Sequence, residues 1–116
     1  MLDRSHRFHG YGSLRATYQR GQTLRGQALS LRFSVRNNNK PYRVAVVVSK
    51  QVSKSAVTRN RIRRRIYEAV RTNADLVPAN SDLIFTAFSD QLAEAKPEKL
   101  QKTVAELLHK TSTPKS

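Results

Sequence analysis

The chain has 116 residues and carries 22 Lys and Arg against 8 Asp and Glu, a formal net charge of +14. It contains no cysteine, which excludes a disulfide scaffold and a cysteine-based zinc site. No apolar run approaches the roughly 20 residues that a membrane-spanning helix needs, and the N-terminus lacks the apolar stretch of a signal peptide. We therefore expect a cytoplasmic protein without a membrane partner, and the charge surplus predicts a polyanionic one.

The first part of the chain predicts a short helix followed by two strands. Residues 13–20 form the expected helix, with Ser13 as its N-cap and Gly21 at its end. Residues 27–36 alternate between apolar and polar side chains, which is typical of a strand with one buried face. The polar face of this strand holds Ser30, Arg32, Ser34 and Arg36.

A second strand is predicted at residues 42–49, which are rich in valine. The Asn- and Pro-containing segment 37–41 between the two strands predicts a turn. We therefore expect residues 27–36 and 42–49 to pair as an antiparallel hairpin.

The most informative segment is 56–71, which combines six arginines with an apolar stripe at helical spacing. Its N-cap is expected at Ser53 or Ser55. At about 100° per residue, Asn60 and Arg64 lie opposite the apolar stripe and Arg59 lies beside it. The stripe consists of Ile62, Ile66, Ala69 and Val70. A solvated amphipathic helix is the alternative, but such helices normally interleave acids, and Glu68 is the single acid in this segment.

The C-terminal part predicts one more strand at 82–88 and a helix that opens at Pro97. Both long helices must bury an apolar stripe, and we expect them to cover the same face of a sheet. The other face would carry the basic strand residues, and Leu14 and Tyr18 from the first helix would line a groove beside them. Such a groove suits unpaired nucleotides. In the alternative interpretation, Leu14 and Tyr18 are core residues.

Catalysis by the protein itself is not indicated. The sequence has no paired-carboxylate signature, no glycine-rich phosphate loop, no cysteine and no close His-Ser-Asp pattern. His6 and His9 have a spacing that suits a metal, but two ligands make a weak site, and we predict no metal-binding residues. A structural or ribosomal RNA-binding protein and a DNA-binding module remain as alternative functions.

The segment from Ala56 through Arg59, Asn60 and Arg61 to Arg64 resembles the signature of the bacterial ribonuclease P protein subunit. The segments at 6–21 and 44–50 resemble the family's N-terminal helix and the strand before its signature helix, and the order of elements matches across roughly residues 5–110. The chain departs from the family pattern at Arg65, where a hydrophobic residue is more usual, and at Tyr67, where a basic one is.

The resemblance implies a fold and an activity. The fold would be α+β, a two-layer α/β sandwich with the order α-β-β-β-α-β-α, like domain 2 of ribosomal protein S5, with a left-handed βαβ crossover. Residues 1–116 would form a single domain, with 1–6 and 111–116 flexible. The protein would be the non-catalytic subunit of an endoribonuclease holoenzyme, in which a catalytic RNA and Mg²⁺, held mainly by the RNA, remove the 5′ leader of precursor tRNA. One protein is expected per RNA.

The resemblance also implies two sets of binding residues. The residues expected to contact the catalytic RNA are Arg59, Asn60, Arg61, Arg63 and Arg64. The residues expected to contact the leader of precursor tRNA are Leu14, Tyr18, Ser30, Arg32 and Lys50.

Overall fold

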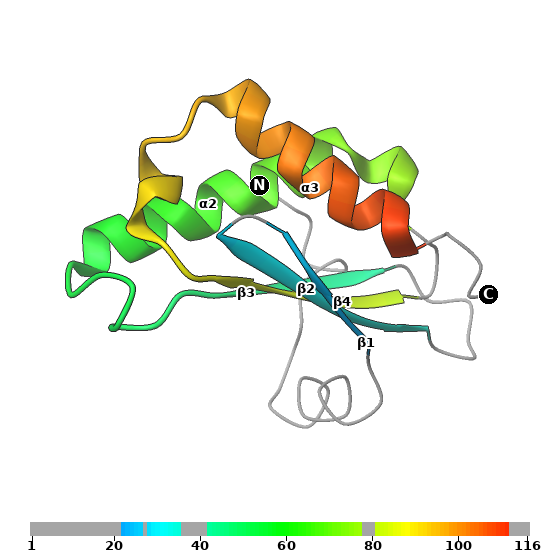
Figure 1. Ribbon diagram of the computed structural model, residues 1–116, viewed down its shortest axis with the longest axis horizontal. Helices are drawn as coiled ribbons and strands as arrows, with labels where there is room; N and C mark the ends of the chain where they lie inside the picture. Colours follow the sequence, from blue (N-terminus) through cyan, green and yellow to red (C-terminus); the bar gives the residue numbers. More distant parts are fainter. Residues whose placement is uncertain (1–21, 27, 36–41, 78–80, 112–116) are drawn as a thin grey trace.

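The computed structural model describes residues 22–26, 28–35, 42–77 and 81–111, which form one layer of strands and one layer of helices (Figure 1). The strands are β1 (Gln22–Arg25), β2 (Leu29–Val35), β3 (Arg43–Val47) and β4 (Ser81–Ala87). The helices are α2 (Ala56–Thr72) and α3 (Pro97–Thr111), with short 3-10 turns η2 (Ala74–Leu76) and η3 (Asp90–Ala93). The predicted α+β class is confirmed. The predicted helix at 13–20 and the turn at 37–41 lie outside the described residues.

The four strands form one sheet in the order β1-β2-β4-β3. β4 pairs antiparallel with β2 and parallel with β3. The predicted hairpin between β2 and β3 is therefore wrong, because β4 lies between them. The physical reason lies in β4 itself, where six of seven residues are buried. A strand that is buried on both faces belongs in the middle of a sheet, where strands on both sides and packed groups above and below cover it.

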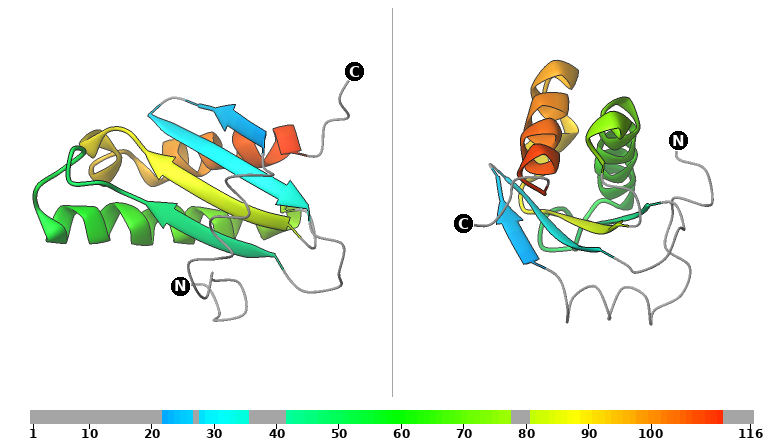
Figure 2. Two further views of the ribbon diagram at one scale, coloured as in Figure 1. Left: turned by 90° about the horizontal axis from the view of Figure 1, so that it is seen from below. Right: turned by 90° about the vertical axis from the view of Figure 1, so that its right-hand side faces the viewer.

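β3 and β4 are parallel neighbours that are connected through α2. In the left view of Figure 2 both strands run in the same direction, β3 lies below β4, and α2 lies behind the sheet. This arrangement makes the crossover left-handed, against the usual right-handed rule. The left-handed crossover that the family resemblance implies is thus present.

Both helices pack on the same face of the sheet, as predicted (Figures 1 and 2). α2 contributes the predicted stripe of Ile62, Ile66, Ala69 and Val70. α3 contributes Leu100, Val104, Leu107 and Leu108. The sheet meets them with Leu29, Leu31, Val44, Val46, Leu83 and Phe85, all buried in one core cluster. Neither described helix is long and apolar enough to cross a membrane.

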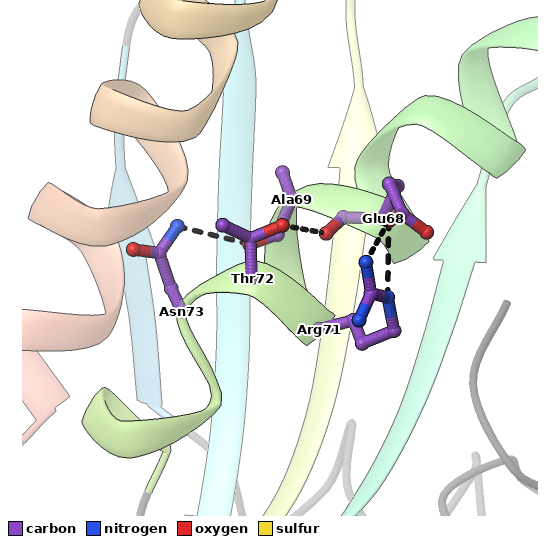
Figure 3. A network of polar contacts seen from close by, with 5 residues as sticks. All are labelled: Glu68, Ala69, Arg71, Thr72 and Asn73. Carbon is purple, nitrogen blue, oxygen red and sulfur yellow. Dashed lines mark hydrogen bonds and ion pairs between the residues drawn. The ribbon is translucent and has the colours of Figure 1, made fainter.

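The two ends of α2 are fixed by side chains. Ser55, one of the two predicted caps, accepts a hydrogen bond from the Thr58 backbone N–H at 3.2 Å. At the other end, the Asn73 amide donates to the carbonyl oxygen of Ala69 at 2.9 Å (Figure 3). It also donates to the carbonyl oxygen of Gln101 in α3 at 3.2 Å. α2 is therefore a rigid element whose far end is tied to α3.

Candidate nucleic-acid interface

The outward side of α2 presents cations and an amide on this rigid helix. Asn60 and Arg64 are exposed, and Arg63 is partly buried. A guanidinium N–H of Arg63 donates to the Asn60 side-chain oxygen, so the two side chains are held together. Arg64 makes no hydrogen bond or ion pair with any residue in the described ranges. We call Asn60, Arg61, Arg63 and Arg64 the basic helix surface.

Two of the predicted RNA-contacting arginines also have structural contacts. Arg59 donates from Nη1 to the carbonyl oxygen of Ser53 at 2.9 Å, which closes the loop before α2 onto the helix. Arg61 donates from Nε to the carbonyl oxygen of Ala93 at 2.9 Å, and its side chain remains exposed. One guanidinium nitrogen of Arg59 thus stabilises the fold. Arg61 uses only its Nε in this way, so its two terminal guanidinium nitrogens can bind an external anion.

Arg65 is a structural residue that the sequence interpretation did not recognise. Its guanidinium donates to three backbone carbonyls, those of Leu92 and Ala93 in η3 and that of Ala95 between η3 and α3. Helix periodicity places Arg65 beside Arg61, but it gives no sign that a segment almost thirty residues later would offer carbonyl groups. These hydrogen bonds hold α2 against the η3 segment.

The last turn of α2 is close to electrically neutral. The Arg71 guanidinium donates to the Glu68 carboxylate three residues earlier, and both side chains are about half exposed (Figure 3). Hydrogen bonding from Arg71 lowers the pKa of Glu68 from 4.5 to about 2. Because Glu68 is the single acid on α2, the arginines that pair with no carboxylate of the helix lie between Arg59 and Arg65.

An open cleft of about 870 Å³ lies between α2 and the start of α3. Its charged lining residues are Arg61, Arg64, Arg65 and Glu68 on the α2 side and Glu94 and Lys96 on the other side. Arg65 fixes the segment that carries the second wall, because it binds the carbonyls of that segment. The cleft therefore extends the basic helix surface toward α3.

The second polar surface is the sheet face turned away from α2 and α3, which we call the open sheet face because neither described helix covers it. Ser30, Asp82 and Ile84 are nevertheless buried on this face. Ser30, Arg32 and Ser34 lie here, because their neighbours Leu29, Leu31 and Phe33 belong to the core side. The predicted basic strand face is thus confirmed for these residues, whereas Arg36 lies outside the described ranges. Arg32 is oriented by a 2.6 Å hydrogen bond from Nη1 to the Thr23 hydroxyl of β1.

One acid on the open sheet face is already paired. Asp82 is 4% exposed, and both its carboxylate oxygens accept from Arg43, at 2.8 and 2.9 Å. Such a two-point pair fixes both side chains and cancels their charge. The pair lies at the β3 edge of this face, and Arg25 and Arg32 lie toward the β1 edge. The positive charge of the face is therefore concentrated over β1 and β2.

The remaining predicted leader contacts are placed only in part. Lys50 is exposed in the turn after β3. Leu14 and Tyr18 lie outside the described residues, so the predicted groove beside the sheet stays a prediction. The residue pattern did not reveal β1, although the family resemblance implied three strands before the central helix, and it gave no sign of the contact between Arg25 and the Phe88 ring. No group of three or more potential metal ligands occurs among the described side chains.

A basic helix and a basic sheet face on a two-layer α+β fold form a charge pattern that is typical of nucleic-acid-binding proteins. The comparison with known families is more specific. A sequence model of the family described as ribonuclease P matches residues 2–112. The chain therefore belongs to the ribonuclease P protein family.

Individual relatives and structures agree with this assignment. The chain is 34% identical over 113 residues to the ribonuclease P protein component of a Synechococcus strain, covering 95% of this chain and 84% of the relative. It is 31% identical over 86 residues to that of Brevibacillus brevis, covering 74% of this chain and 68% of the relative.

Two solved structures show the same fold at low sequence identity. The RNase P protein of Staphylococcus aureus aligns with a TM-score of 0.77 at 19% identity, covering 92% of this chain and 95% of that one. The RNase P protein of Thermotoga maritima aligns with a TM-score of 0.76 at 20% identity, covering 90% and 96%. Family membership implies participation in tRNA processing together with an RNA partner.

Proposed function

We propose that this chain is the protein subunit of a cytoplasmic ribonuclease P, with one protein bound to each catalytic RNA. In this role it binds the RNA subunit and the 5′ leader of precursor tRNA, and it promotes endonucleolytic removal of the leader to give the mature 5′ end. The observation that carries the proposal is the basic helix surface, which presents unneutralised guanidinium groups on a rigid, capped helix.

The basic helix surface is assigned to the catalytic RNA. Arginine suits a folded RNA because its planar guanidinium makes paired hydrogen bonds to phosphate. Arg61, Arg63 and Arg64 extend from a helix whose buried side is locked in the core, so their backbone positions do not need to be ordered on binding. Asn60 adds an amide that can read a base edge or a 2′-hydroxyl. Arg59, at the edge of this surface, belongs to the same assignment.

The open sheet face is assigned to the leader. A single strand needs cations for its phosphates and flat or apolar groups for its bases. Arg32 supplies a cation that is oriented by Thr23, and Ser30 supplies a hydroxyl on the same face. Lys50 lies exposed beyond the end of β3 and would meet the strand where it leaves the sheet. Leu14 and Tyr18 are proposed to contact the same strand.

The hydrolytic chemistry is assigned to the RNA and Mg²⁺, with the metal held mainly by RNA phosphates. Magnesium prefers carboxylate and phosphate oxygens. In the described part of the chain, Asp82 and Glu68 already accept hydrogen bonds from Arg43 and Arg71. No three of the described acidic and histidine side chains lie close enough together to hold a metal ion, so the described residues do not fit a Mg²⁺ site. The protein's task is to bind and to position RNA.

Cleavage of precursor tRNA tests this function. Protein with its cognate RNA subunit should cleave at low Mg²⁺, where the RNA alone is slow, and RNA-free protein should not cleave. Precursor tRNA should bind the holoenzyme more tightly than mature tRNA does, because only the precursor carries a leader. Cleavage by RNA-free protein, or a protein that leaves the RNA reaction unchanged, would overturn the proposal.

A further inference from the structure

An exposed aromatic ring and a guanidinium group form a flat pair at the β1 edge of the open sheet face. The Arg25 guanidinium carbon lies 4.9 Å from the centroid of the Phe88 ring. Phe88 is 49% exposed, among the largest exposures of any large apolar side chain in the described ranges, and Arg25 is also exposed. A pair of this kind contributes only ~0.5–1 kcal/mol to stability at an exposed site. The stability of the fold therefore does not by itself explain why a phenylalanine is exposed here.

The backbone holds both members of this pair in place. Phe88 follows the last residue of β4, and its N–H donates to the carbonyl oxygen of Ala28 at 2.9 Å. Ala28 lies in the turn between β1 and β2, with a positive φ of 61° that is uncommon for a residue with a Cβ. The turn is closed by a 2.8 Å bond from the Gly26 N–H to the Leu29 carbonyl oxygen. The ring and the guanidinium are thus attached to the same short turn.

The pair continues the line of polar groups on the open sheet face. Arg25 lies opposite Ser30 in the register of β1 and β2, and Thr23 lies opposite Arg32. Two residues along a strand cover ~6.8 Å, a step that one nucleotide of an extended chain can span. Phe88 lies a further two residues along, beside Ala28. A strand whose phosphate meets Arg32 therefore brings a base one or two nucleotides further on to the Arg25–Phe88 pair.

We propose that Arg25 and Phe88 form a stacking platform for one base of the single-stranded leader. Every nucleobase has a flat face, and bases stack on aromatic rings and on guanidinium planes. The platform would recognise an unpaired nucleobase of any identity, and its cation would also attract the adjoining phosphate. This inference rests on the proposed leader-binding role of the open sheet face and adds a base-binding position to it.

The experiment uses the holoenzyme assembled from the full-length protein and the cognate catalytic RNA. Precursor tRNAs are prepared with a single abasic nucleotide at each leader position in turn, and their affinities are measured for the parent and for Phe88→Leu. The parent should lose about fivefold or more in affinity at one abasic position, because one stacked base is absent. Phe88→Leu should bind the intact leader as weakly as the parent binds the leader that is abasic at that position. Making that position abasic should then cause no further loss of affinity for Phe88→Leu.

Three other variants serve as controls. Phe88→Tyr keeps the ring and should reproduce the parent's abasic profile. Arg25→Lys keeps the charge but removes the planar group, and should weaken the response at the same position without altering the packing of Phe88. Leu76→Ala truncates an apolar side chain of similar exposure in η2, which follows α2, and should behave as the parent does.

The outcomes separate the platform from the proposed function. If Phe88→Leu and Arg25→Lys give the parent's abasic profile at every position, the platform is refuted while leader binding stands. If the parent holoenzyme binds leader-bearing and leaderless tRNA equally, its abasic profile is flat. In that case the proposed function fails, and the platform fails with it.

Discussion

Arg64 and Arg65 are adjacent arginines on α2, and the structure predicts opposite consequences for their loss. Arg65→Met keeps the length of the side chain but removes every hydrogen bond to the carbonyls of Leu92, Ala93 and Ala95. A hydrogen bond from a charged donor contributes ~1.5–3 kcal/mol. Because Arg65 is only partly buried, water replaces part of this contribution, and the net cost is about 2–3 kcal/mol.

A cost of this size is measurable by thermal unfolding. At this chain length 1 kcal/mol shifts the midpoint by about 4 °C, so Arg65→Met should unfold about 8–12 °C below the parent. Arg64→Met should unfold within a degree or two of the parent, because Arg64 has no partner among the described residues. Well below both midpoints, Arg64→Met should instead bind the catalytic RNA more weakly by ~1–3 kcal/mol, with a salt slope shallower by about one unit.

This pair of variants can refute the reasoning in two ways. An Arg65→Met protein as stable as the parent would show that the three carbonyl contacts do not hold the η3 segment to α2. An Arg64→Met protein with parental RNA affinity across a salt series would show that the basic helix surface does not face the RNA.

Three further predictions concern single contacts. Ser55→Ala should destabilise the protein by ~1 kcal/mol in chemical denaturation, because the Thr58 N–H loses its cap, and Ser55→Asn should restore stability. Arg32→Gln should weaken binding of leader-bearing precursor tRNA to the holoenzyme and leave mature tRNA unaffected, and an equal loss for both would contradict the open-face assignment. Glu68 should titrate near pH 2 by carboxyl NMR and return toward 4.5 in Arg71→Gln. Since the pKa of Glu68 is lower in the folded state, its pairing stabilises the protein above about pH 4.5, and this contribution is lost as the pH falls toward 2.

The sequence predicted the elements whose signal is local. The spacing of Ile62, Ile66 and Val70 identified both the helix and its buried side, and the structure confirms them. The alternation in β2 likewise separated Leu29 and Leu31 from Ser30 and Arg32. These predictions succeed because side-chain direction repeats every 3.6 residues in a helix and every two in a strand, whatever the rest of the chain does.

Other features depend on which distant segments contact one another, and only the tertiary structure determines those contacts. Periodicity showed that β2 and β3 are strands, but their separation by β4 follows from the burial of β4 on both faces. The same holds for two arginines: Arg65 binds carbonyls some thirty residues later, and Arg25 covers the ring of Phe88. From the sequence alone, a charged side chain is expected to be solvent-exposed. The backbone carbonyl or aromatic ring that contacts it comes from a distant segment, and which segment that is depends on packing and not on any periodic pattern.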